Sequence, residues 1–259
     1  MKVFARMEFV ALSTPVLIAI GLIVFGAATV KGVAGLGFPL ITVPLVANIV
    51  GPHAAVVIIA VPTVASNLFM VAHGGGTVAR LRQLAWLIAG LVAGAAVSAR
   101  LLREINPAVL GLILGVIAVS YAGAELVRVP LRLPASPRPA LSLGIGAAAG
   151  LLGGATTIYA PLVAAYVDSL RLAKNEFVFW VTALFLIGTT IQVLTYLQAG
   201  IYRGGLLGIA LLLCLPMLVG TWIGIRMRDR LSPDRFRTLV LVLVLLSGLN
   251  LILRTLWRC

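Results

Sequence analysis

The chain has 259 residues, a net charge of +13 and a mean hydropathy of +1.15, with 61% hydrophobic and only 10% charged residues. Soluble domains carry about 25% charged residues, so this composition excludes a water-soluble fold and predicts an integral membrane protein. The basic residues lie in short gaps between apolar runs, as lipid headgroups and the positive-inside rule require, and this excludes nucleic acid as the partner.

Ten apolar segments follow one another along the chain, five in each half. They cover residues 10–30, 38–50, 54–72, 84–101, 107–127, 140–153, 155–167, 177–199, 204–226 and 235–254. A membrane-spanning helix needs about 20 apolar residues, so most of these segments are predicted to span, and the first is interpreted as a retained helix. The segments 38–50 and 155–167 are too short, and we expect half-helices there. The predicted fold is an all-α integral membrane protein.

A glycine-rich stretch precedes each short segment. The first reads KGVAGLGFPLITVP, ending at Pro44, and the second reads AGLLGGATTIYAP, ending at Pro161. A helix inside a membrane opens only where its freed backbone groups are buried in protein or line a watery cavity. Matching breaks in two halves point to a midplane binding site between internal repeats, which is a transporter architecture.

The two halves are interpreted as repeats of one module. RLLREINP, ending at Pro107, resembles RMRDRLSP, ending at Pro233, and a Pro- and Arg-rich linker lies between the halves. The expected division is a first repeat at 1–127, a linker at 128–139 and a second repeat at 140–259. The loops at 78–82, 128–138, 170–174 and 226–237 hold most of the basic residues, which predicts that they are cytoplasmic, that both termini are periplasmic and that the repeats are inverted.

The candidate substrate-binding residues lie in and beside the two breaks. The N-terminal end of a half-helix offers free N–H donors to an anion. Buried hydroxyl and amide groups add further donors. The candidates are Lys31, Gly32, Gly35, Gly37, Ser66, Asn67, Gly153, Gly154, Thr156, Thr157, Tyr159 and Gln192.

Each candidate has a structural alternative. Polar side chains in membrane helices also bond neighbouring helices, and Lys31 could extend its stem to the headgroups instead. His73, before a glycine turn, is interpreted as a helix cap, with a proton-carrying role left open. Gly90, Gly94, Gly220 and Gly224 are expected only to let helices pack closely.

Several stretches of the chain match the motifs of one known family. They are the first glycine break followed by VP and the stretches SNLFMVAHGGGTV, GLVAGAAVSARLL, LPMLVGTWIGIRM and FRTLVLVLVLLSG. On these motifs most of the chain, from about Gly21 to Leu253, resembles the TauE/SafE sulfite exporter family. The resemblance implies export or exchange of small sulfur-containing or carboxylate anions, such as sulfite or organosulfonates, without ATP.

The seven acidic residues all fall at segment ends or in loops, so no midplane carboxylate pair is expected. This favours a non-enzymatic, inner-membrane transporter of small anions without a cofactor or metal. The alternatives are an intramembrane lipid-phosphate enzyme, which would need an acid/base or metal cluster, and a membrane scaffold. The exact substrate, the coupling ion and the oligomeric state stay open, with a homodimer among the states allowed.

Overall fold

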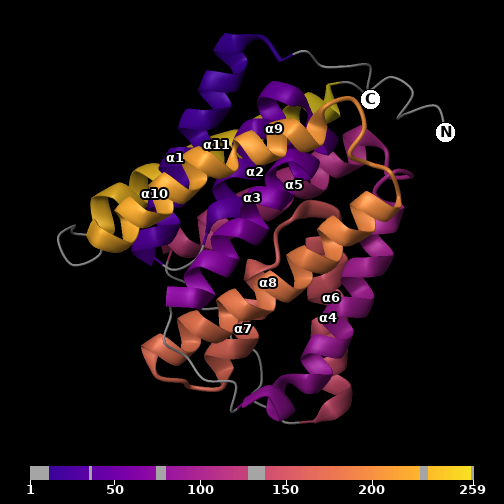
Figure 1. Cartoon of the computed structure of the whole chain (residues 1–259), viewed down its shortest axis with the longest axis vertical. Helices are drawn as coiled ribbons and strands as arrows, with labels where there is room; N and C mark the ends of the chain where they lie inside the picture. The colour runs from indigo at the N-terminus through magenta and orange to yellow at the C-terminus, as the bar shows by residue number, and fades with distance from the viewer. Residues whose placement is uncertain (1–11, 35–36, 74–79, 128–137, 228–232, 258–259) are drawn as a thin grey trace.

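The computed structural model describes residues 12–34, 37–73, 80–127, 138–227 and 233–257. The described part is a bundle of helices without strands (Figure 1). In chain order the helices are α1 (Thr14–Ala34), α2 (Phe38–Val50), α3 (Pro52–His73), α4 (Leu81–Leu101), α5 (Pro107–Val127), α6 (Pro139–Thr156), α7 (Ala160–Ser169), α8 (Lys174–Gln198), α9 (Leu206–Leu212), α10 (Cys214–Met227) and α11 (Pro233–Leu256).

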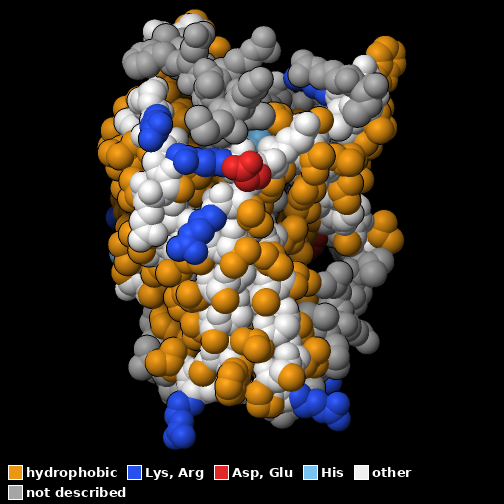
Figure 2. Space-filling view, turned by 90° about the vertical axis from the view of Figure 1, so that its right-hand side faces the viewer, with side chains coloured by type: hydrophobic (Ala, Val, Ile, Leu, Met, Phe, Trp, Pro, Cys, Tyr) orange, Lys and Arg blue, Asp and Glu red, His pale blue; other side chains and the backbone are white. Residues whose placement is uncertain are grey.

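The all-α membrane fold is confirmed. Seven stretches among the described helices are long and apolar enough to cross a membrane, with α9 and α10 together counted as one. Many large aliphatic side chains point outward, including Leu22, Ile18 and Val116, as they do in proteins whose surrounding solvent is hydrocarbon. On the face shown in Figure 2, hydrophobic side chains cover the middle, and Lys and Arg lie toward the two ends. The protein is therefore a multi-pass membrane protein.

The predicted segments match the helices closely, with one split. The stretch 204–226 is divided into α9 and α10 at Leu213. Pro216 has no N–H to bond the carbonyl of Leu212, and its ring crowds that carbonyl, which breaks the helical ladder at this point.

Both helix breaks are narrower than the sequence pattern indicates. Helix α1 continues through Gly32 to Ala34, and α6 continues through Gly153 and Gly154 to Thr156. These three glycines were expected inside the broken segments, and that expectation is wrong. Within the two breaks, the described residues outside the helices are Gly37 and Thr157 to Tyr159.

The proline pairing also differs from the prediction. Pro39 and Pro161 both occupy the first turn of a short helix, where a missing N–H costs nothing. Pro44, which the sequence pattern paired with Pro161, lies inside α2.

Glycines bring two pairs of long helices into close contact. A Cβ on Gly94 would lie 2.3 Å from the carbonyl oxygen of Ala147, and one on Gly150 would lie 2.3 Å from that of Leu91, so α4 and α6 touch through their backbones. In the same way, a Cβ on Gly224 in α10 would lie 2.2 Å from the carbonyl oxygen of Thr29 in α1. The packing role expected of Gly90, Gly94, Gly220 and Gly224 agrees with these contacts.

Helix directions follow from the order of these contacts. Along α4 and α6 the residue numbers of the contacting positions increase together, so the two helices run parallel. Helix α5 meets α11 through Gly111 beside Thr255 and through Gly248 beside Ala118. The residue numbers change in opposite directions there, so that pair is antiparallel. Thus α1 packs on α10 as α6 packs on α4, while α5 and α11 pack on each other in opposite directions. The inverted orientation of the two repeats stays a prediction. The proposed linker lies almost wholly outside the described residues, and the division of the chain at 128–139 stays a prediction.

The two short helices have different surroundings. Helix α2 packs on α11, where Asn48 Nδ2 donates to Ser247 Oγ over 2.8 Å and Asn250 Nδ2 donates to Asn48 Oδ1 over 2.6 Å. Helix α7 instead stands beside a cavity of about 540 Å³ that side chains of α5 also line, among them Tyr121. The halves are thus alike in the order of their helices and unlike in how tightly the short helix is held.

Candidate functional site

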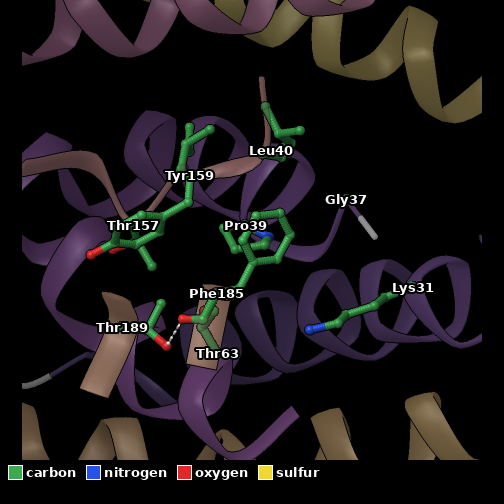
Figure 3. A pocket seen from close by; sticks show the side chains of 11 residues that line it. Lys31, Gly37, Pro39, Leu40, Thr63, Thr157, Tyr159, Phe185 and Thr189 are labelled. Carbon is green, nitrogen blue, oxygen red and sulfur yellow. Dashed lines mark hydrogen bonds between the residues drawn. The ribbon is translucent and has the colours of Figure 1, made fainter. Parts of the chain in front are cut away.

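The two helix breaks meet in one small cavity near the centre of the bundle. Its lining comes from α1, the start of α2, α3, the second break and α8, and it is shown in Figure 3. The lining residues are Lys31, Gly37, Pro39, Leu40, Thr63, Thr157, Ile158, Tyr159, Ala160, Phe185 and Thr189. Of the residues predicted from the sequence, the structure brings Lys31, Gly37, Thr157 and Tyr159 around a common space, and their role in binding stays a prediction.

The cavity is narrow in this structure. Its volume is about 10 Å³, which is the space that one water molecule needs. A sulfite or sulfonate anion is larger than water, so the surrounding side chains must move apart before such an ion can enter.

Lys31 lies in the last turn of α1 with only 1% of its surface exposed. Its Nζ donates a hydrogen bond to Oδ1 of Asn67 in α3. Figure 3 shows the Lys31 amine extending toward the side of the cavity lined by Thr63 and Phe185. The alternative that this side chain reaches the headgroups does not fit a buried amine held by an amide in the bundle interior.

Two hydrogen-bond donors of α3 have no partner within the described protein. Ser66 and Asn67 are both fully buried in α3. Among the described residues neither Ser66 Oγ nor Asn67 Nδ2 has a hydrogen-bond partner. Burying an unsatisfied polar group costs about 1–3 kcal/mol. Helix α3 thus carries two donors whose bonding capacity the described protein does not use, one of them on the amide that bonds Lys31.

Gly37 marks the first break by its backbone. It precedes α2 with φ 105°, in the left-handed region that glycine enters without penalty, and it lines the cavity. Gly35, also predicted as a binding residue, lies outside the described residues.

Gly32 and Gly154 have neighbours of a different kind. A Cβ on Gly32 would lie 2.5 Å from the carbonyl oxygen of Thr221 in α10, and one on Gly154 would lie 2.5 Å from that of Ala95 in α4. Both positions therefore need glycine for helix packing, and neither lines the cavity.

Hydrogen bonds made by residues at the second break stabilise its non-helical backbone. The hydroxyl of Thr156 donates to the carbonyl of Leu152 and accepts from the backbone N–H of Ile158 over 3.1 Å. Thr157 adopts φ 64° and its N–H closes the end of α6 on the carbonyl of Gly153. These bonds satisfy backbone groups that the interrupted helix would otherwise leave unpaired in the membrane interior.

Tyr159 fills the space beside that break. A Cβ on Gly153 would lie 2.2 Å from the Tyr159 ring and one on Gly188 2.6 Å from it, so the ring lies against both glycines. Its hydroxyl donates to the carbonyl of Gly188 over 2.9 Å. Gly153 therefore contributes to the site only through Tyr159, whose ring packs against it.

Gln192 joins the second break to α8. Its Nε2 donates to Thr157 Oγ1 over 3.0 Å and to Tyr196 Oη over 2.8 Å, and the Tyr196 hydroxyl donates to the carbonyl of Gly154. Tyr196, Thr63 and Phe185 were not predicted. Tyr196 follows Gln192 by four residues on one helix, and that spacing is the signal that could have identified it.

The comparison with protein families gives one match. The family model described as Sulfite exporter TauE/SafE matches residues 20–251 of the 259-residue chain. The protein belongs to the TauE/SafE family. Neither the curated proteins nor the solved structures contain a match to the chain. Membership agrees with the resemblance found in the sequence motifs, and it makes a membrane transporter of sulfite-like anions the expectation for this fold.

Proposed function

We propose that this TauE/SafE protein exports small anions such as sulfite or organosulfonates, and that it binds them at the midplane between the two helix breaks. The observation that carries the proposal is the buried amine of Lys31, which bonds the side chain of Asn67, together with the unused donors of Asn67 and of the adjacent residue Ser66. A buried ammonium group is costly unless an opposite charge accompanies it, and a bound anion would supply that charge together with acceptors for the two donors.

The second break would contribute neutral donors on the opposite wall. Thr157 and Tyr159 line the same cavity as Lys31, and their hydroxyl groups could turn toward oxyanion oxygens when the cavity opens. Gln192 bonds Thr157 and accepts from Tyr159 over 3.4 Å, so its part is to hold these two side chains in position.

Export of an anion needs no coupling ion in this scheme. With the cytoplasm negative, outward movement of one elementary negative charge gains about 2.3 kcal/mol per 100 mV. The arrangement would operate in the inner membrane with both termini periplasmic, as the distribution of basic loop residues predicts.

The test is flux of labelled sulfite, sulfoacetate, thiosulfate and simple carboxylates from proteoliposomes. Lys31→Ala should lower sulfite flux at least about tenfold, the loss that one charge-assisted hydrogen bond produces. Thr42→Ala is the matched control, because Thr42 is equally buried but its hydroxyl bonds the carbonyl of Phe38 within its own helix. If the wild-type protein moves none of these anions, the proposed function is wrong. Hydrolysis of lipid phosphates in the same vesicles would instead identify the enzyme alternative, which no contact among the described residues favours.

A further inference from the structure

The Lys31 amine has no negative charge beside it among the described residues. Its side chain is buried, and within the described part of the chain its hydrogen bond goes to the neutral amide of Asn67. Lys31 forms no ion pair with a described carboxylate, and none of the residues that line the central cavity is acidic. A positive charge on Lys31 is therefore not balanced by the described protein.

Two helix dipoles add positive charge at the same place. Gly37, the residue before α2, and Tyr159, the residue before α7, line the same cavity as Lys31 (Figure 3). The N-terminus of a helix is equivalent to about half an elementary positive charge. Two such ends repel an ammonium group and attract an anion.

No acidic side chain that the structure describes faces Lys31 from the neighbouring elements. Helix α2 has no titratable residue. On α10, Arg226 follows the residues that meet Gly32, and its guanidinium group stacks over the ring of Trp222 at 3.9 Å from the centroid. The hydroxyl of Tyr159 donates to a backbone carbonyl of α8. The other titratable side chains described on α3, α8, α10 and α11 lie toward the helix ends and do not line the cavity, namely His53, His73, Glu176, Tyr196, Cys214 and Arg254.

These surroundings favour the neutral form of the amine while no anion is bound. Burial removes the hydration of an ammonium group, and a buried group without a counter-charge gives up its charge instead. A neutral amine still has N–H groups to donate to Asn67 Oδ1. An anion in the cavity reverses the preference, because the attraction between opposite charges is strong where protein excludes water.

We propose that Lys31 takes up one proton each time an anion binds and releases it when the anion leaves. The proton comes from the aqueous side from which the anion enters, so the amine becomes an ammonium group beside the anion, and the reverse transfer accompanies release. This inference rests on the proposed function, since it takes the central cavity as the anion site. A sulfite dianion would then cross with one proton, as one net negative charge, and the membrane potential still favours its export.

The dependence of sulfite affinity on pH tests this linkage. Uptake of one proton on binding makes the affinity fall about tenfold for each unit by which the pH rises. Lys31→Arg is the matched control, because arginine stays charged and has no proton to take up. Labelled sulfite is titrated onto both proteins in nanodiscs at about pH 8 and about pH 9, where a solvated lysine is protonated and sulfite is a dianion. Between these two values the affinity of the wild-type protein should fall about tenfold more than that of Lys31→Arg.

A second measurement detects the charge of Lys31 directly. The chain has three lysines, Lys2, Lys31 and Lys174, so the NMR signals of isotope-labelled lysine ε-carbons are few. The signal that is absent from Lys31→Arg belongs to Lys31. At about pH 8, where a solvated lysine is protonated, this signal should have the chemical shift of a neutral amine without sulfite and that of an ammonium group with saturating sulfite. The signals of Lys2 and Lys174 should not change.

A steeper fall in affinity for the wild-type protein, together with the change in the Lys31 signal, would support the proposal. Equal pH dependence in the two proteins, or a Lys31 signal that bound sulfite leaves unchanged, would overturn it and leave the proposed function intact. If Lys31→Arg does not fold, Lys31→Gln serves as the reference, because glutamine does not titrate either. Failure of the proposed function would show separately, as absent flux in a wild-type protein whose sulfite binding is still linked to a proton. Absence of any sulfite binding would overturn the site and this inference together.

Discussion

The amine of Lys31 in α1 donates its hydrogen bond to the side-chain carbonyl of Asn67 in α3, so a buried amine of the bundle is joined to a neutral amide. The amide carbonyl offers a dipole but no charge. This relationship explains why the proposed site suits an anion: the amide orients the amine, and the ligand would neutralise it.

Substitutions at Lys31 separate charge from packing. We predict that Lys31→Ala weakens sulfite binding by at least about tenfold, whereas Lys31→Arg, which keeps the charge, weakens it much less. Binding is measured by titration of labelled sulfite onto the purified protein in nanodiscs. Equal affinity in both variants and the wild-type protein would mean that the lysine has a structural role only.

Asn67 is expected to contribute both to the stability of the protein and to its affinity for sulfite. Replacement by Leu removes the partner of a buried amine, which should lower the free energy of unfolding by about 1–3 kcal/mol. Bound sulfite would replace part of the lost interaction, so the gain in melting temperature on adding sulfite should be larger in Asn67→Leu than in Lys31→Ala. The reverse order would show that Asn67 is not part of the binding site.

Glycine substitutions distinguish backbone conformation from close packing. Gly94→Ala and Gly154→Ala would each force a Cβ against backbone atoms of a neighbouring helix, and we predict a lower melting temperature and yield for both. Gly37→Ala meets only a side-chain atom of Ile41 at 3.9 Å, and its cost of about 1–2 kcal/mol comes from φ 105° instead. It should chiefly impair binding, because the start of α2 would shift.

The control for these variants is Gly26→Ala. Nothing lies within 4 Å of a Cβ at Gly26 in the interior of α1, so alanine should leave stability unchanged or raise it by up to about 1 kcal/mol through its higher helix propensity. Thermal unfolding, followed with and without sulfite, compares all four proteins. Stability of Gly154→Ala equal to that of Gly26→Ala would contradict the packing role.

The seam between α2 and α11 offers a test of movement. Asn48 and Ser247 are hydrogen-bonded across it, whereas α7, at the corresponding place in the second half, borders the 540 Å³ cavity. If α2 must leave α11 during transport, a disulfide formed after Asn48→Cys and Ser247→Cys, in a protein lacking Cys214 and Cys259, should stop sulfite flux. Reduction should restore it. Undiminished flux through the oxidised protein would show that the seam stays closed throughout the cycle.

Helix positions could be read from the sequence because apolar length and glycine or proline interruptions decide them locally. The roles of individual glycines could not. Gly32, Gly37 and Gly154 look alike in the sequence, yet only Gly37 leaves the helix, while the other two are fixed by contacts with α10 and α4. Such contacts join residues far apart in the chain, and no local pattern contains them.

Part of the candidate site could be predicted from the sequence because polar residues are rare in the apolar helices. A lysine, an asparagine and a glutamine stand out in apolar helices, and the structure brings Lys31 to Asn67 and Gln192 to Thr157. Tyr196 was missed because a tyrosine at the end of a helix is common near membrane surfaces. Its hydrogen bonds to Gln192 and Gly154 depend on how α8 packs against α6.

Orientation in the membrane is the last prediction, and the arginine asymmetry between the two sets of loops motivates it. Asn106 lies in the turn after α4, at the end of the bundle predicted to be periplasmic, and Arg171 lies in the turn after α7, at the end predicted to be cytoplasmic. In a protein without Cys214 and Cys259, a single Asn106→Cys substitution should react with an impermeant thiol reagent in intact cells. A single Arg171→Cys substitution should react only after the membrane is made permeable. Both positions carry side chains outside the buried core, Asn106 and Arg171 being exposed, so a difference in labelling reports the side of the membrane rather than burial. Labelling in the opposite sense would contradict this orientation and invert the protein in the membrane.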